Sequence, residues 1–317
     1  MRLALLFSPQ GSQVVGMGRE LAEHSSAARA TFEEADVTLG WSVTEACWQG
    51  PVERLNDTRQ TQPCLLATSV AAYRALGERV EVEPLLVAGH SVGEYAALVA
   101  AGVLDFGASL RLVARRAALM AAVDADGGMS AVLGLDRAAV EAVVATVGRP
   151  TELVVANDNA PGQVVISGRR DALAAAEAPL RAAGAKRIVR LPVSGAFHSP
   201  LMAEVADGLA AAFEGENWHD AQVPMISNVT AEPVTDAGRI RALLAEQVRS
   251  PVEWVRSVDR MSDEGIDLAV ECGSGNALTG MLKRIAPGMR TANVVDLASL
   301  EVAAQLLATG VATPASV

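Results

Sequence analysis

The chain has 317 residues, half of them apolar, which is enough to bury a large core as one α/β domain or as one domain with an insertion. Its formal net charge of −11 argues against nucleic acid as a partner, because phosphate binding needs clustered lysine and arginine. The longest apolar stretches, such as residues 96–104, contain glycine and fall short of the ~20 residues that cross a bilayer, so no membrane span is expected.

Apolar runs rich in β-branched residues alternate with alanine-rich stretches of helical character, and this alternation predicts an α/β fold around a mostly parallel sheet. The first run, Leu3–Phe7, has no signal-peptide cleavage pattern after it and is interpreted as a buried strand. Further core strands are predicted at 85–88, 224–227 and 267–271. Long helices are predicted at 93–101 and 106–123.

The middle of the chain has a different order of elements. It predicts, in sequence, a strand at 129–135, a helix at Arg137–Val147, strands at 153–157 and 163–167, a helix at 171–183 and a strand at 187–192. This β-α-β-β-α-β order is the ferredoxin-like motif. We therefore expect residues 126–193 to form a small subdomain inserted into a large subdomain of residues 1–125 and 194–317. The tail at 308–317 is expected to fray.

The stretch Gly89-His90-Ser91-Val92-Gly93 lies between the predicted strand 85–88 and the helix that follows it. That context is the one a nucleophile elbow needs, because glycines allow the tight turn that exposes the serine. Ser91 is therefore the candidate nucleophile. The backbone N–H of Val92, at the helix N-terminus, is a candidate donor to a developing oxyanion.

A serine nucleophile needs a base within hydrogen-bond reach, and the chain offers four histidines. His24 and His219 lie in polar segments and are interpreted as surface residues, whereas the side chain of His90 should point away from its neighbour on an elbow. His198 remains, in the loop sequence LPVSGAFHSPLM. By pattern alone it could equally be an ordinary helix-capping histidine.

Five motifs, in order, resemble the malonyl-CoA:acyl-carrier-protein transacylase family, which includes the acyltransferase domains of polyketide synthases. They are FSPQGSQVVGMG, GHSVGEYAALVAAGVLDF, ANDNAPGQVVISG, VSGAFHSPLM and ECGSGNALTGMLKRI, and the match runs from about residue 3 to about residue 290. The resemblance implies an α/β-hydrolase-like large subdomain with a ferredoxin-like insertion. It also implies ping-pong acyl transfer, with Ser91 as nucleophile and His198 as general base and then acid.

The resemblance assigns further roles around this pair. The family orients its histidine with a glutamine or asparagine carbonyl rather than a carboxylate, and Gln247 matches that position. The second oxyanion donor would be the backbone N–H of Gln10. The family motif F-P-G-Q-G-S-Q reads FSPQGSQ here, so Pro9 replaces the first glycine and fixes φ near −65°.

Arg116 matches the family arginine that forms a bidentate pair with the carboxylate of a malonyl group, a geometry that suits a guanidinium better than an ammonium. It follows Ser91 by twenty-five positions in LRLVARRAALM, close to Arg111 and Arg115. The alternative interpretation is that all three arginines form a solvated basic face. If Arg116 is instead buried without a protein partner, a substrate carboxylate is its natural counter-ion.

Acyl size is predicted from Phe197, directly before His198, and from Val92, directly after Ser91. The residues at both positions resemble the pattern of malonyl-selective family members, and a bulky Phe197 would fill the space that a methyl branch needs. Gln62 and Asn159 match further family positions near the acyl pocket. Each could equally be a turn or strand-end residue.

No metal or redox cofactor is expected, and coenzyme A enters only as part of the thioester substrate. The glycines in Gly273-Ser-Gly275 lack a third dinucleotide-binding glycine, because Leu278 stands in its place. Three widely spaced cysteines suit a reducing cytoplasm. The expected partner is an acyl carrier protein with its phosphopantetheine arm. Two alternatives stay open: a polyketide acyltransferase for another acyl group or a carrier-bound donor, and a hydrolase that clears misloaded carriers.

Overall fold

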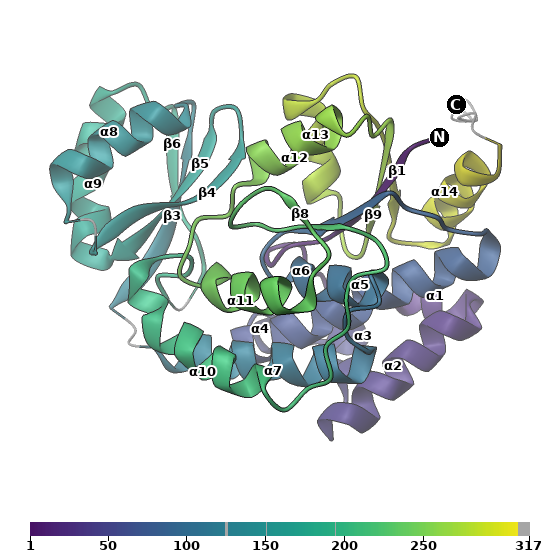
Figure 1. The fold of residues 1–317 in the computed structure, drawn as a ribbon. Helices are drawn as coiled ribbons and strands as arrows, with labels where there is room; N and C mark the ends of the chain where they lie inside the picture. Colours follow the sequence, from purple (N-terminus) through teal and green to yellow (C-terminus); the bar gives the residue numbers. More distant parts are fainter. Residues whose placement is uncertain (124–125, 150, 194, 310–317) are drawn as a thin grey trace.

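The computed structural model describes residues 1–123, 126–149, 151–193 and 195–309, which form two β-sheets with helices packed on them (Figure 1). The strands are β1 (Leu3–Phe7), β2 (Leu86–Gly89), β3 (Gly127–Leu133), β4 (Leu153–Ala160), β5 (Gln163–Arg169), β6 (Arg187–Arg190), β7 (Met225–Ile226), β8 (Pro233–Val234), β9 (Leu268–Cys272) and β10 (Arg290–Val294). The helices are α1 (Arg19–His24), α2 (Ser26–Leu39), α3 (Val43–Gln49), α4 (Val52–Leu55), α5 (Thr58–Arg79), α6 (Gly93–Ala100), α7 (Phe106–Ala122), α8 (Arg137–Val147), α9 (Arg170–Ala182), α10 (Ala203–Phe213), α11 (Ala237–Gln247), α12 (Trp254–Asp263), α13 (Ala277–Ile285) and α14 (Leu297–Thr309), with a 3-10 turn at Pro200–Met202.

The larger sheet has the strand order β10-β9-β1-β2-β7-β8 and is parallel except for the antiparallel pair β7–β8. Every residue of β1, β2 and β9 is buried, as expected for parallel strands covered on both faces. One face packs on a core that includes residues of α5, α6 and α7, and the other packs on α12 and α13 (Figure 1). This is the α/β-hydrolase-like part of the fold.

The smaller sheet has the order β4-β5-β3-β6 with antiparallel neighbours throughout. Helices α8 and α9 cover one face of this sheet and share a separate apolar core with β3, β4 and β5 (Figure 1). Two register shifts interrupt the β4–β5 pairing, between Val155 and Asn157 and between Asp158 and Ala160. The observed β-α-β-β-α-β order is the ferredoxin-like arrangement that the sequence predicts.

Most predicted elements differ from the observed ones by one or two residues at each end, and Leu3–Phe7 and Arg137–Val147 agree fully. The strand β4 is longer than predicted and ends at Ala160. Residues 308 and 309 end α14 rather than fraying, and the remainder of the predicted tail lies outside the described residues. The subdomain boundaries predicted at 125 and 194 also fall on residues outside the described ranges, so these boundaries stay a prediction.

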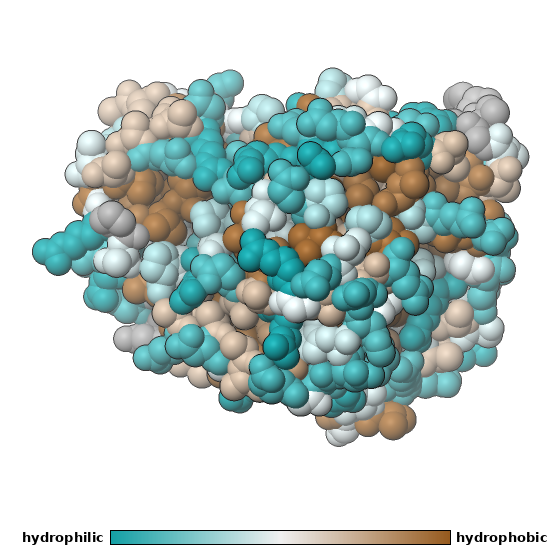
Figure 2. All heavy atoms as spheres, viewed as in Figure 1, coloured by the Kyte–Doolittle hydropathy of each residue, from teal (hydrophilic) through white to brown (hydrophobic). Residues whose placement is uncertain are grey.

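The loops that carry the candidate residues leave the carboxyl ends of neighbouring parallel strands. The segment with Gln10 follows β1, and the segment with Ser91 follows β2, its hydrogen-bonded neighbour. Ligand sites in open α/β sheets lie at this edge. The face in Figure 2 is mostly hydrophilic. Within the described ranges, no helix combines the length and the apolar character that crossing a membrane requires.

Candidate active site

Ser91 occupies a strained turn between β2 and α6, with φ of 54°. The two flanking glycines are required by close packing, since a Cβ on Gly89 would lie 2.0 Å from the main chain of Gly93, and one on Gly93 would lie 2.2 Å from the carbonyl oxygen of Phe7. Asn228 holds the turn: its side-chain oxygen accepts the Ser91 N–H at 2.7 Å, and its amide nitrogen donates to the Gly89 carbonyl at 2.7 Å. The serine is thereby fixed in a geometry that few residues adopt unaided.

His198 meets the serine directly. Its Nε2 lies 2.7 Å from the Ser91 Oγ, and its Nδ1 lies 2.9 Å from the main-chain oxygen of Gln247 and 3.2 Å from that of Ser250. A carbonyl oxygen can only accept, so Nδ1 carries the proton and Nε2 is free to take one from Ser91. The carbonyl expected from Gln247 is therefore its main-chain carbonyl, and its side chain is used elsewhere.

The environment keeps the His198 ring neutral. Burial, and then the positive charge of Arg116, lower its pKa to about 3. None of the other three histidines makes a hydrogen bond to the Ser91 Oγ. His24 and His219 are exposed, and His90 turns away to place Nε2 2.8 Å from the Asn159 side-chain oxygen.

Arg116 is 1% exposed, so a solvated basic face is the wrong interpretation for it. Its Nη1 donates to the Gln62 side-chain oxygen at 2.8 Å, and its Nη2 donates at 3.0 Å both to the Ser91 Oγ and to the Gln247 side-chain oxygen. Arg116 is thus buried and has protein acceptors, so it does not depend on a substrate carboxylate as its sole partner. The surface interpretation does hold for exposed Arg111, which pairs with Glu216 at 2.7 Å, and for exposed Arg115.

Two buried residues in this network were not predicted, Glu94 and Asn228. One carboxylate oxygen of Glu94 accepts the Asn228 N–H at 2.7 Å, and the other accepts from the Gln247 side-chain nitrogen. Burial raises the pKa of Glu94 to about 7, although the nearby Arg116 charge opposes the rise. A sequence signal for Glu94 did exist: it is the one charged residue in the apolar run GEYAALVAAG.

Gln10 is half-buried in the loop after β1, and its side-chain oxygen accepts from Gln62, the partner of Arg116, at 3.2 Å. The loop accommodates Pro9 in a turn closed by the Ser12 N–H, which donates to the Pro9 carbonyl at 3.3 Å. The positive φ this turn needs, 102°, falls on Gly11. Val92 is buried immediately before the first residue of α6, so its N–H lies at the helix N-terminus as predicted.

A cavity of about 200 Å³ opens onto Ser91 and His198 between the two sheets. Gln10 and His90 line it from the larger part of the fold, and Asn159 lines it from β4. Phe197 adds a buried aromatic wall beside His198. Gln62 is fully buried and reaches this site through its hydrogen bond to Arg116.

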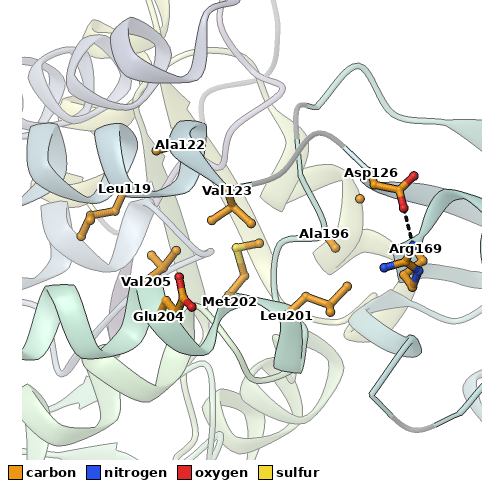
Figure 3. Close-up of a pocket in the computed structure, with 11 residues that line it drawn as sticks. Leu119, Ala122, Val123, Asp126, Arg169, Ala196, Leu201, Met202, Glu204 and Val205 are labelled. Carbon is orange, nitrogen blue, oxygen red and sulfur yellow. Dashed lines mark hydrogen bonds and ion pairs between the residues drawn. The ribbon is translucent and has the colours of Figure 1, made fainter.

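A larger hollow of about 440 Å³ lies beside the loop that carries Phe197 and His198, and its lining residues differ from those of the smaller cavity (Figure 3). Leu119 and Val123 contribute apolar walls from one side and Leu201 from another, and an ion pair of 2.5 Å joins Asp126 to Arg169 at the edge. No serine or histidine is among its lining residues in the described ranges. The hydrogen-bonded Ser91–His198 pair therefore opens onto the smaller cavity and not onto this hollow.

Within the described residues, no group of three histidine, cysteine or carboxylate side chains could hold a metal ion. Gly273 has a packing role, because a Cβ there would lie 2.6 Å from the Ser8 hydroxyl oxygen. The three cysteines are free and buried.

A serine at a strand-to-helix elbow, hydrogen-bonded to a histidine in an α/β-hydrolase-like fold, defines the class of serine acyl-transfer enzymes. The family model of the acyl transferase domain matches residues 4–302. The malonyl CoA-acyl carrier protein transacylase of Escherichia coli K12 is 39% identical over 307 residues, which are 96% of this chain and 99% of that protein.

Solved structures agree in sequence and in fold. An acyl-carrier-protein S-malonyltransferase from Burkholderia pseudomallei is 39% identical with a TM-score of 0.94, covering 96% of this chain and 100% of that one. A malonyl-transacylase in complex with its type II polyketide synthase acyl-carrier protein is 40% identical with a TM-score of 0.93, covering 96% and 99%. The chain belongs to the acyl transferase domain family, among relatives that are malonyl transacylases.

Proposed function

We propose that this protein transfers a malonyl group from coenzyme A to the phosphopantetheine thiol of an acyl carrier protein, through an ester on Ser91. The observation that carries the proposal is that one serine oxygen contacts both a neutral histidine and a buried arginine. His198 lies at 2.7 Å and Arg116 at 3.0 Å from Oγ. The histidine serves acyl transfer in general, and the arginine adds a charge that an acyl group bearing a carboxylate can use.

In the first half-reaction the Ser91 oxygen attacks the thioester carbon while its proton moves to His198 Nε2. The oxyanion that forms accepts hydrogen bonds from the backbone N–H groups of Gln10 and Val92. Collapse of the tetrahedral intermediate breaks the carbon–sulfur bond, and His198 returns the proton to the departing thiolate of coenzyme A.

In the second half-reaction the carrier's thiol gives its proton to His198 and attacks the Ser91 ester. Ser91 then leaves and recovers the proton, which restores the free enzyme. The main-chain carbonyl of Gln247 keeps the imidazole in the required tautomer throughout. Arg116 holds the malonyl carboxylate during both half-reactions.

The acyl group is limited by the side chains around the cavity. Phe197 is buried beside His198, where it narrows the space for a branch on the acyl chain. Asn159 lines the same cavity and, through His90, links β4 to the elbow. Malonyl is thus favoured over methylmalonyl. The reaction as proposed uses no cofactor, and the three free cysteines agree with a cytoplasmic location.

Intact-mass analysis after brief mixing with malonyl-, methylmalonyl- or acetyl-CoA tests the function. We expect a malonyl adduct on Ser91 that persists in water and discharges rapidly when a phosphopantetheinylated carrier protein is added. Rapid release of malonate without a carrier would instead indicate a hydrolase. Preferential loading of methylmalonyl would indicate an acyltransferase for another acyl group.

A further inference from the structure

Glu94 is a carboxylate in the interior that the proposed reaction leaves unused. It lies in the first turn of α6, three residues after Ser91, and is 2% exposed. Burying a charged group is costly unless it is hydrogen-bonded or paired. Its two oxygens accept from the Asn228 N–H and from the Gln247 side-chain nitrogen, so the carboxylate joins the elbow to α11.

The contact with Glu94 fixes which way the Gln247 amide faces. The amide nitrogen has two hydrogens, and they go to the Glu94 carboxylate and to the Ser91 main-chain oxygen, the latter at 2.9 Å. The amide oxygen must then face the other way, where it accepts from Arg116 Nη2 at 3.0 Å. A rotated amide would set its NH2 group against the guanidinium and its oxygen against the carboxylate, two unfavourable contacts.

The direction of the Gln247 amide in turn positions Arg116. The guanidinium is held on one side by Gln62 and on the other by Gln247. These two acceptors, with the Ser91 Oγ, hold both terminal nitrogens of Arg116, so the orientation of the planar guanidinium depends on the Gln247 amide. Above a pH of about 7, where Glu94 is ionised, it also supplies an opposite charge to Arg116 within the protein interior.

We propose that Glu94 is a positioning residue: through the Gln247 amide it holds Arg116 in place for the carboxylate of the acyl group, and so sets selectivity for carboxyacyl substrates without touching them. This inference rests on the proposed malonyl transfer. It predicts that the identity of residue 94 affects malonyl loading far more than acetyl loading, because an acetyl group makes no use of the guanidinium fork.

The test is Glu94→Gln, which keeps the size of the side chain and removes its charge. The new amide can accept only one of the two donors that face Glu94, and its NH2 group opposes the other. The Asn228 N–H is fixed in the main chain, so Gln247 is the partner that must rotate and turn its NH2 toward Arg116. Glu94→Asp tests the same link in a second way, because it keeps the charge but shortens the reach.

The measurement is the single-turnover rate of acyl-enzyme formation with malonyl-CoA and with acetyl-CoA over a range of concentrations. We expect the malonyl-to-acetyl ratio to fall about tenfold or more in Glu94→Gln, through a higher half-saturating malonyl-CoA concentration, as for loss of a hydrogen bond to a charged group. If Glu94→Gln does not fold, Glu94→Asp is judged by the same ratio.

Glu253→Gln is the matched control, because the buried side chain of Glu253 pairs with Arg137, and its one contact with this network, a main-chain hydrogen bond to Asn228, is kept in the variant. Its ratio should equal that of the wild type. A wild-type ratio in Glu94→Gln, or an equal fall in malonyl and acetyl loading, overturns the positioning role. A wild type that does not load malonyl at all overturns the proposed function instead, so the two failures are distinguishable.

Discussion

Arg116 Nη2 lies 3.0 Å from the Ser91 hydroxyl oxygen, so the positive charge proposed to bind the acyl carboxylate also contacts the nucleophile. Ser91 Oγ can accept this hydrogen bond while it donates its proton to His198. A guanidinium at this distance stabilises negative charge that develops on Oγ during attack. The same charge helps to lower the pKa of His198 and keeps the imidazole ready to accept the serine proton.

Replacing Ser91 with alanine should abolish formation of the acyl-enzyme while the protein stays folded. The side chain projects into the cavity, and Asn228 holds the turn through the main-chain N–H, which alanine retains. Intact-mass analysis after mixing with malonyl-CoA measures the adduct, and a thermal unfolding curve checks the fold. An adduct on the variant would disprove the assignment of Ser91 as nucleophile.

His198→Ala should reduce acyl-enzyme formation about as strongly as Ser91→Ala reduces it. The two side chains act on one proton, and the effects of residues that act as a unit are not additive. Single-turnover loading of both single variants and of the double variant measures this. A double variant far slower than either single variant would show that the two residues act independently.

The parts of the fold and of the candidate site that lie within short sequence segments could be predicted from the sequence. The elbow with Ser91 and the buried strand Leu3–Phe7 follow from local pattern, whereas the roles of His198 and Arg116 were assigned from the family motifs. The strand β10 was missed because it is a half-exposed edge strand with the polar sequence RTANV, which has no apolar run.

The interior network around the elbow could not be predicted in the same way. Asn228 lies 137 positions from Ser91, and Gln247 lies 153 positions from Glu94, so only the tertiary fold brings their side chains together. Gln247 also has two separate roles: its main-chain oxygen accepts from His198, and its side-chain oxygen accepts from Arg116. Nothing in the identity of a glutamine distinguishes these two roles.

The rate of acyl-enzyme formation should not fall with pH as it would if the base were a histidine of ordinary pKa. The pKa of His198 lies at about 3 instead of 6.5, so the neutral base persists as the pH falls to 5, where a free imidazole would lose its basic form about thirtyfold. The rate of acetyl-enzyme formation from pH 8 to pH 5 measures this pH dependence. The rate is compared between the wild type and Glu94→Gln, because the variant removes the titration of Glu94. A thirtyfold fall in both proteins would contradict the shifted pKa.

The same shift makes a prediction for stability. Because the folded protein holds His198 below its ordinary pKa, the unfolded chain binds the extra proton first as the pH falls. The stability associated with neutral His198 is therefore present above pH 6.5 and declines between pH 6.5 and 3. In His198→Ala, denaturant titrations across this window should show a weaker loss of stability than in the wild type.

Asn228→Ala should destabilise the protein and slow loading together. The change leaves the Ser91 N–H and the Gly89 carbonyl without their partner, at a cost of ~1–3 kcal/mol for each buried group. Asn217→Ala, at an exposed asparagine, is the control and should change neither quantity. Urea unfolding and single-turnover loading measure the two effects. Full loading activity in Asn228→Ala would show that the elbow keeps its shape unaided.

Arg116→Ala separates a carboxyacyl transferase from an ordinary serine esterase. If the guanidinium holds the malonyl carboxylate, its loss should remove roughly 1.5–3 kcal/mol of binding, or about ten- to a hundredfold in malonyl loading. Acetyl loading should suffer less, since an acetyl group forms no ion pair with Arg116, and the fall that remains reports the contact between Arg116 and the Ser91 oxygen. Arg111→Ala, on the same helix but exposed and paired with Glu216, is the matched control. The ratio of malonyl to acetyl loading, measured at one salt concentration, should fall only in Arg116→Ala. An unchanged ratio would mean that the carboxylate is bound by another group.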